Sequence, residues 1–109
     1  MVLKEYLIGN LQNTYEIIPS TLPNSSEDDY PDFAFDICTK MDKNTDLGIL
    51  ICGTGIGISI AANKVKGIRC ARVNNLEDAK NARIHNHANV IAIPASLDNN
   101  YALEIIKTF

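Results

Sequence analysis

The feature that most constrains the fold is an apolar strand that runs directly into a glycine-rich loop and then a helix. Residues 47–51 are a continuous apolar run, which predicts a strand buried on both faces. Cys52 follows, with glycines at positions 53, 55 and 57, and residues 60–63 have the composition of the first turns of a helix. Glycine adopts backbone conformations closed to other residues and allows a ligand to approach closely. The segment therefore predicts a strand–loop–helix unit whose loop faces a ligand.

The thiol of Cys52, which opens this loop, indicates chemistry as well as binding. A loop that feeds a helix N-terminus offers unpaired N–H donors and a partial positive charge. Such an environment stabilises the thiolate, which is the reactive form of cysteine. A nucleotide is the alternative ligand, but no acidic residue ends the next strand to hold a ribose, which disfavours a dinucleotide site.

Strand-like and helix-like segments alternate along the rest of the chain. Strands are expected at residues 15–18, 47–52, 68–73 and 89–95, and a polar loop at 19–29. Helices are expected at 31–43, after the glycine loop, at 75–85 with Asn75 as the cap and Asp78 at the third position, and at 97–109. Alternation of this kind predicts a parallel sheet covered by helices on both faces. Ligands of such sheets bind at the carboxyl ends of strands, where Cys52 and Asn74 fall.

Composition excludes several classes of function. The 109 residues fit one domain, residues 1–109. A formal net charge of −3 without a basic stripe argues against nucleic acid as a partner. There is no apolar run of roughly 20 residues and no visible signal peptide, so we expect neither a membrane partner nor export. The three cysteines are odd in number and lack CxxC spacing, which argues against a metal site or disulfide framework and favours the cytoplasm.

Three segments carry a resemblance to a known family. They are residues 29–34, residues 48–69, and the group Ala82-Arg83, His85-Asn86 and 88–90. In these segments the chain resembles the sugar-phosphate isomerases of the ribose-5-phosphate isomerase B and galactose-6-phosphate isomerase family. The resemblance implies a three-layer α/β/α sandwich with a mostly parallel, Rossmann-like sheet of the flavodoxin type. It also implies an aldose–ketose isomerase that needs no metal or cofactor and works through an enediolate on a sugar phosphate.

The resemblance also assigns roles to individual residues. Cys52 matches the base that moves a proton between neighbouring carbons, and Thr54 is placed to move a proton between the two sugar oxygens. His85 matches the acid/base that opens the sugar ring, a task that suits an imidazole. Asn86 matches a hydroxyl ligand and Tyr30 a residue that lines the pocket. The remaining substrate-binding positions are the backbone N–H groups of the loop, which would stabilise an oxyanion, and one arginine: Gly53, Gly55, Gly57, Ser59 and Arg83.

The chain departs from the family in the residues that hold the phosphate. Aligned on Tyr30, it begins inside the helix that follows the family's first strand, so that strand and its Asp-His pair are absent. The family's arginine-bearing tail lies beyond Phe109, and Ser96 replaces a further arginine. Arg83 and Lys64 remain as partial substitutes. Without the first strand, the sheet has a gap in which backbone groups lack partners.

The beginning of the chain allows two structures. Residues 5–8 form either a strand that replaces the missing one or part of the helix that follows it. Gly9 and Asn10 are poor helix formers, which favours the strand. Only about six residues separate this segment from Tyr15, however, too few for a parallel crossover, and the family spacing favours the helix.

Two functional hypotheses follow from these observations. The first is a cytoplasmic isomerase of ribose 5-phosphate and ribulose 5-phosphate. The second is a non-catalytic family member, either a structural subunit of a hetero-oligomer, such as a galactose-6-phosphate isomerase subunit, or a sugar-phosphate-binding remnant. A protein-interaction module has no positive support. The resemblance implies a homodimer or higher homo-oligomer in which a neighbour completes each site.

Overall fold

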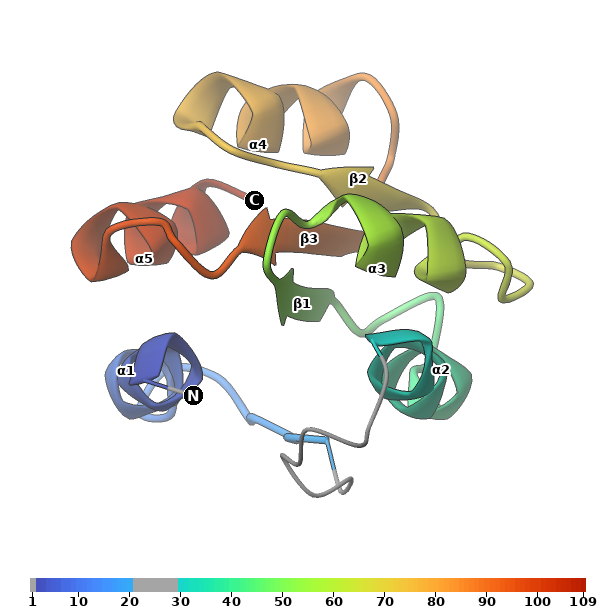
Figure 1. The fold of residues 1–109 in the computed structure, drawn as a ribbon, viewed down its shortest axis with the longest axis horizontal. Helices are drawn as coiled ribbons and strands as arrows, with labels where there is room; N and C mark the ends of the chain where they lie inside the picture. Colours follow the sequence, from blue (N-terminus) through green and yellow to red (C-terminus); the bar gives the residue numbers. More distant parts are fainter. Residues whose placement is uncertain (1, 21–29) are drawn as a thin grey trace.

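In the computed structural model, which describes residues 2–20 and 30–109, a parallel three-stranded sheet carries five helices (Figure 1). The strands are β1 (Gly48–Cys52), β2 (Cys70–Arg72) and β3 (Val90–Pro94), in the spatial order β1-β3-β2. The helices are α1 (Val2–Leu11), α2 (Tyr30–Lys40), α3 (Ile56–Ala62), α4 (Leu76–Ile84) and α5 (Asn99–Thr108). The predicted α/β fold with a parallel, Rossmann-like sheet is confirmed.

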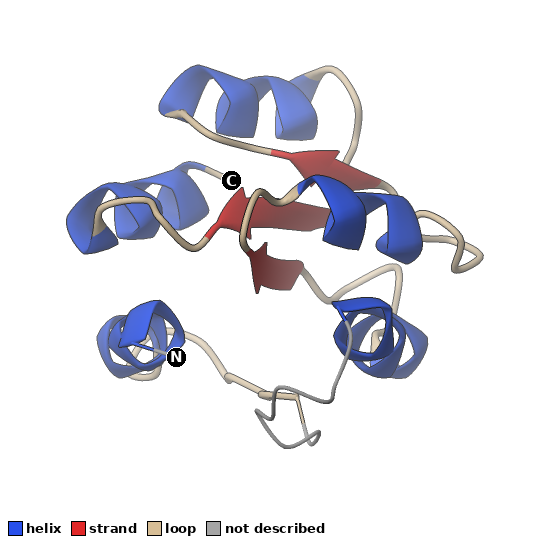
Figure 2. Ribbon diagram, in the orientation of Figure 1, coloured by secondary structure: helices blue, strands red, loops and turns tan. Residues whose placement is uncertain are grey.

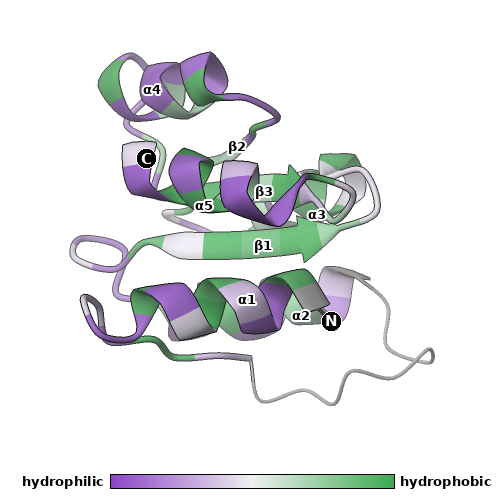
Figure 3. Cartoon of the chain, turned by 90° about the vertical axis from the view of Figure 1, so that its left-hand side faces the viewer, coloured by the Kyte–Doolittle hydropathy of each residue, from purple (hydrophilic) through white to green (hydrophobic). Residues whose placement is uncertain are grey.

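The central strand β3 separates two apolar layers because its side chains alternate between the faces of the sheet. Ile91 and Ile93 pack with α1, α4 and α5, whereas Val90 and Ala92 pack with α2 and α3. All five residues of β3 are buried, as expected for a strand covered on both faces. Figure 2 shows the sheet between these helices, and in Figure 3 β1 is hydrophobic after its pale beginning. The predicted three-layer arrangement is thus confirmed.

Local hydrogen bonds explain why several elements are shorter than the sequence predicts. The side chain of Asn75 accepts from the N–H of Asp78 at 2.8 Å, so the predicted cap of α4 is confirmed. Asp98 caps α5 in the same way, through the N–H of Tyr101, and therefore α5 begins at Asn99 and not at residue 97. β2 begins at Cys70 and not at residue 68, because the side chain of Asn89 accepts a hydrogen bond from the N–H of Arg69 at 2.8 Å.

The structure decides between the two alternatives for the beginning of the chain. Residues 5–8 belong to α1, so the helix is confirmed and the strand is wrong. Leu3, Leu7 and Leu11 form the buried face of this helix, against α5. α2 ends at Lys40, three residues earlier than predicted, because a polar turn follows it, in which the N–H of Asp42 bonds the Asp46 carboxylate at 3.0 Å.

The predicted strand at residues 15–18 is wrong. These residues form no ladder, although residues 16–20 run as irregular chain opposite β1 (Figure 1). A strand is stable only beside a partner, and no described strand lies next to this segment. Of the predicted polar loop at 19–29, residues 21–29 lie outside the described residues.

A groove of about 690 Å³ occupies the place where the sequence predicts a gap in the sheet. It is lined by β1, α1, α2 and the segment 16–20, with Ile49, Ile51, Leu7 and Ile37 among its apolar side chains. One side of β1 therefore faces β3 and the other faces this groove. Within the described residues, no helix is long and apolar enough to cross a bilayer.

Candidate active site

Cys52 lies at the carboxyl end of β1, where the ladder fixes the backbone. It pairs with Pro94 of β3, and its carbonyl oxygen accepts from the N–H of Ala95 at 2.8 Å. The side chain is half-buried and the thiol is free. The prediction that Cys52 ends a strand at the carboxyl edge of the sheet is confirmed, but the predicted burial of this strand on both faces is wrong: only Gly48 and Leu50 of β1 are buried, because its other side faces the groove.

The loop after β1 points a backbone donor at this thiol. The N–H of Gly55 lies 3.1 Å from the Sγ of Cys52. Gly55 has a φ of +79°, in the left-handed region that glycine adopts without strain. A Cβ there would lie 3.3 Å from the carbonyl oxygen of Ala92 and 3.4 Å from Cγ of Arg72. Position 55 therefore requires glycine both for its conformation and for its close contact with β3.

Helix α3 begins at Ile56, four residues earlier than the sequence indicates. The hydroxyl of Thr54 accepts from the N–H of Ile56 at 3.2 Å, and the carbonyl of Gly55 accepts from the N–H of Ser59 at 3.3 Å. Gly57 and Ser59 are consequently helical. The hydroxyl of Ser59 donates to the carbonyl of Ile56 at 2.7 Å, so both donors of Ser59 are engaged within the protein.

Other backbone donors of the loop differ from those of Ser59 in their hydrogen bonding. In the described part of the chain, the N–H groups of Gly53, Thr54 and Gly57 form no hydrogen bond. They lie within five residues of the thiol along the chain, and Gly53 and Thr54 are exposed. The loop can therefore offer several fixed neutral donors to an anionic group beside Cys52.

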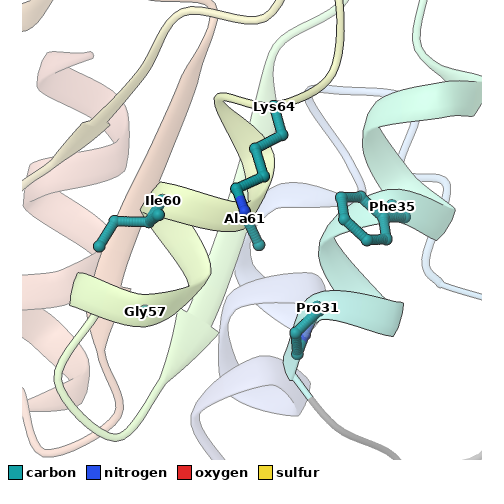
Figure 4. A pocket seen from close by; sticks show the side chains of 6 residues that line it. All are labelled: Pro31, Phe35, Gly57, Ile60, Ala61 and Lys64. Carbon is teal, nitrogen blue, oxygen red and sulfur yellow. The ribbon is translucent and has the colours of Figure 1, made fainter.

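A shallow pocket of about 140 Å³ lies beside the loop, between α2 and α3 (Figure 4). Pro31 and Phe35 of α2 lie opposite Gly57, Ala61 and Lys64, and the side chain of Ile60, at the edge of the pocket, points away from α2. Lys64 places a cation at the rim, where the sequence suggested a partial substitute for the missing phosphate ligands. Tyr30 precedes Pro31 in the first turn of α2. The larger groove along β1 is a separate cavity, because none of the loop residues 52–57 lines it.

His85, Asn86 and Arg83 lie at the opposite end of the sheet from Cys52. His85 caps the C-terminus of α4, and the loop 85–89 leads into the start of β3, whereas Cys52 is the last residue of the parallel strand β1 (Figure 1). A five-residue strand spans about 16 Å. One chain therefore does not bring Cys52 and His85 to the same small substrate.

The side chains at this second location have local partners. Asn86 donates to the carbonyl of Asn81 at 3.2 Å. Arg83 donates to the carbonyl of Ala88 at 3.0 Å, and its guanidinium lies 5.5 Å from the ring centre of Phe109. His85 itself is exposed. Arg83 thus holds the end of α4 to the end of α5. His85 is more available than Arg83 or Asn86 for contact with a substrate.

Arg72 is a contact of the loop that the sequence analysis missed. It is the last residue of β2, and its Nε donates to the carbonyl of Thr54 at 2.9 Å. β2 and β1 are not neighbours, since β3 lies between them. The only sequence signal is an arginine at the carboxyl end of a predicted strand, which does not show how far the side chain reaches.

The other two thiols belong to the core. Burial raises the pKa of Cys70 to about 12, with a further contribution from the nearby Cys38. Burial also raises the pKa of Cys38, although Lys43 opposes the shift. Both thiols therefore stay protonated at neutral pH. The described residues contain no group of three His, Cys, Asp or Glu side chains that could hold a metal ion.

Known proteins are similar to this chain over most of its length. The family model described as ribose/galactose isomerase matches residues 1–109. A protein of Mycoplasma genitalium named as a probable ribose-5-phosphate isomerase B is 45% identical over 94 residues, which are 84% of this chain and 60% of the relative. The ribose-5-phosphate isomerase B of Escherichia coli is 40% identical over 93 residues, 84% of this chain and 62% of the relative. The chain thus spans about three fifths of the length of these two curated relatives.

A solved structure has the same fold. The crystal structure of ribose-5-phosphate isomerase B from Mycoplasma genitalium with bound ribulose-5-phosphate aligns with a TM-score of 0.89 and 39% identity. The alignment covers 100% of this chain and 75% of that one.

Proposed function

Since the chain belongs to the ribose/galactose isomerase family, we propose that it interconverts ribose 5-phosphate and ribulose 5-phosphate through an enediolate, with Cys52 as the base. The observation that carries the proposal is the N–H of Gly55, held 3.1 Å from the Sγ of Cys52 at the carboxyl end of a strand. A relative of the same fold has ribulose-5-phosphate bound, which supports the substrate class.

The geometry suits a proton transfer at carbon. A thiolate at Cys52 accepts the hydrogen bond from Gly55, which stabilises the charged form. The thiolate removes the proton from C2 of the open aldose, and the resulting thiol returns it to C1, which gives the ketose. The exposed hydroxyl of Thr54 moves the second proton between O1 and O2. The thiol must stay reduced for this role, which suits the cytoplasm.

Negative charge on the enediolate needs donors that are already in place. The N–H groups of Gly53, Thr54 and Gly57 have no protein acceptor in the described residues. Fixed neutral donors stabilise a developing oxyanion without reorganising during the reaction. These groups therefore serve the sugar oxygens, and Tyr30 has the role that the family resemblance implies for it, lining the sugar pocket.

His85 and Asn86 act in the site of a neighbouring copy in a homodimer. They lie a strand length away from Cys52 of their own chain, so a second copy has to supply the acid/base that opens the sugar ring. Three large apolar side chains at the two locations are exposed as an interface requires: Ile56 and Ile60 on α3 are 49% and 58% exposed, and Ile84 beside His85 is 57% exposed.

A coupled isomerase assay with ribose 5-phosphate tests the role of Cys52. We expect turnover by the 109-residue chain, a loss of at least about a thousandfold in Cys52→Ser, and near wild-type turnover in the control Cys70→Ala. Circular dichroism checks that each variant is folded. Wild-type turnover in Cys52→Ser would exclude Cys52 as the base, and no turnover in the wild-type chain would favour the non-catalytic family member.

Mixing two inactive variants tests the shared site. Cys52→Ala and His85→Ala should each be inactive alone. After the subunits exchange, about half of the dimers are mixed, and each mixed dimer has one intact pair of Cys52 and His85, so about a quarter of the activity should return. No recovery, although sedimentation shows dimers, would mean that the neighbour's His85 does not serve the site.

A further inference from the structure

Arg72 connects the outer strand of the sheet to the loop beside Cys52. Its side chain starts at the end of β2 and passes over the carboxyl end of β3, and its Nε donates to the carbonyl of Thr54 at 2.9 Å. Gly55, the next residue, is buried between this side chain and β3, since a Cβ there would lie 3.4 Å from Cγ of Arg72 and 3.4 Å from the carbonyl carbon of Ile93. The loop is thus held from the side opposite to Cys52.

The two hydrogen bonds of the loop share one peptide unit. The carbonyl of Thr54 and the N–H of Gly55 belong to the same planar trans peptide, so they point in opposite directions. The carbonyl bonds Nε of Arg72 at 2.9 Å, and the N–H lies 3.1 Å from the Sγ of Cys52. A rotation of this peptide breaks both bonds at once. Glycine at position 55 resists such a rotation less than any other residue, so the orientation depends on its partners.

Asn74 fixes the guanidinium in turn. With its amide oxygen turned toward Arg72, Asn74 accepts from Nη1 at 3.0 Å and from Nη2 at 3.2 Å, and only this orientation of the amide pairs a donor with an acceptor. The planar guanidinium of Arg72 is therefore held on both sides: its two terminal nitrogens donate to Asn74, and its Nε donates to Thr54. Asn74, which the sequence placed at a strand end without a role, supports the position of Arg72.

We propose that Arg72 is a positioning residue for Cys52: by holding the carbonyl of Thr54, it keeps the N–H of Gly55 directed at the sulfur and so stabilises the thiolate. The inference rests on the proposed function for its catalytic consequence, although its effect on the thiol does not require a substrate. Arg72 acts through the peptide and not by binding the sugar phosphate.

Two substitutions separate the hydrogen bond from the charge. In Arg72→Gln, the side-chain nitrogen takes the place of Nε, so a donor to Thr54 is retained and the charge is lost. In Arg72→Lys, a methylene takes that place, so the charge is retained and the donor there is lost. Arg69→Ala is the matched control, because Arg69 lies on the same segment and its Nε likewise donates to a backbone carbonyl, that of His87 at 2.7 Å, at the other end of the sheet.

Alkylation of Cys52 by iodoacetamide, followed by peptide mass spectrometry, measures the thiolate directly. Cys38 and Cys70 do not compete, because burial raises the pKa of both. The readout is the alkylation rate at pH 7 divided by the rate at pH 10, a ratio that corrects for differences between variants in access to the sulfur. A hydrogen bond to a charged group changes the ratio of thiolate to thiol by about tenfold. We expect this ratio to fall about tenfold in Arg72→Lys and Arg72→Ala, and to stay within about twofold of wild type in Arg72→Gln and Arg69→Ala.

Isomerase kinetics supply the second readout. Arg72→Lys and Arg72→Ala should lower kcat about tenfold with little change in KM, and Arg72→Gln should restore kcat. The inference is overturned if Arg72→Lys behaves like wild type while Arg72→Gln behaves like Arg72→Ala, or if KM alone rises, since Arg72 would then act by charge or bind the phosphate. If the wild-type chain has no isomerase activity, the proposed function fails, but the alkylation ratio still decides the role of Arg72.

Discussion

The two sides of β1 differ in how completely their backbone and side chains are paired. On the side of β3 and the glycine loop, the ladder pairs all five residues of β1, and Gly55, Thr54 and Arg72 form a connected set of hydrogen bonds around Cys52. On the other side, the groove of about 690 Å³ separates β1 from α1 and from the segment 16–20, which forms no backbone hydrogen bonds with β1. The candidate active site lies on the fully paired side.

This difference separates local geometry from global stability. The positions of the thiol and its donors depend on contacts among the carboxyl ends of β1, β2 and β3. The attachment of α1 depends on its apolar contacts with α5. On the side where α1 lines the groove, the packing is incomplete. A substitution on the groove side should therefore change the free energy of unfolding without moving the site, and a substitution in the loop should mainly affect the site, with a smaller change in the free energy of unfolding.

Backbone amide exchange should show the largest contrast, within β1 itself. The N–H of Gly48 donates to Asn89, and the carbonyl of Cys52 accepts from Ala95. The backbone N–H groups of alternate residues in a strand point to opposite sides. The N–H of Leu50 therefore points to β3, like that of Gly48, while the N–H groups of Ile49 and Ile51 point into the groove.

Hydrogen exchange measured by NMR should therefore be slower at Leu50 than at Ile49 and Ile51, on the order of a hundredfold or more. Equal protection at all three amides would mean that another strand covers the groove side of β1, and the comparison between the two sides would fail.

Leu7→Ala should have the largest effect on stability. Leu7 is 4% exposed, packs in the core on the face of α1 that meets α5, and also lines the groove. Removing its side chain leaves a cavity, and such substitutions cost about 2–5 kcal/mol. We expect a value near the lower end, since a groove already adjoins the site.

Urea unfolding measures this change, and the rate of Cys52 alkylation below the unfolding transition is the control for the site. A changed alkylation rate in folded Leu7→Ala would show that the two sides of β1 are coupled.

Gly55→Ala should have a smaller effect on stability but a strong one on the site. The left-handed backbone at position 55 costs a residue with a side chain about 1–2 kcal/mol, and the added Cβ would meet Ala92 at 3.3 Å. The peptide would rotate to relieve this strain, which removes the N–H from Cys52.

Isomerase kinetics should then show a decrease in kcat of about tenfold or more, while urea unfolding shows only the modest loss of stability. An unchanged kcat in Gly55→Ala would mean that the N–H of Gly55 does not support the base.

The sequence predicts best those features that depend on local pattern and on chain order. The alternation of apolar strands and helices predicts the parallel sheet, and the Asn75–Asp78 spacing predicts the cap of α4. Placing Cys52 at a carboxyl end requires only that a buried strand precede the loop. Each of these inferences uses contacts within a few residues or a topological rule that holds for most folds.

Two of the missed features depend on partners distant in the sequence, and a third, the start of α3, depends on a local hydrogen bond. The segment 15–18 has the composition of a strand, but strand formation requires a neighbour, and none is present among the described strands. The start of α3 was misplaced because Ile56 and Gly57 are weak helix formers, and the hydroxyl of Thr54 compensates as an acceptor. The contact of Arg72 with Thr54 spans the width of the sheet, so no spacing along the chain indicates it.

Gly9→Ala, the counterpart of Gly55→Ala on the groove side, should have the smallest effect and the opposite sign. Gly9 lies within α1, is exposed, and a Cβ there would meet no atom within 4 Å. Alanine loses less conformational entropy than glycine in a helix, so we expect a gain of about 0.5–1 kcal/mol in the free energy of unfolding. Urea unfolding measures the gain, and kcat and the Cys52 alkylation rate should not change. Because the two substitutions add the same methyl group, their opposite signs would show that glycine is required by geometry in the loop and only tolerated in α1. If Gly9→Ala destabilised the chain, α1 would have to pack more tightly than its open surroundings at Gly9 indicate.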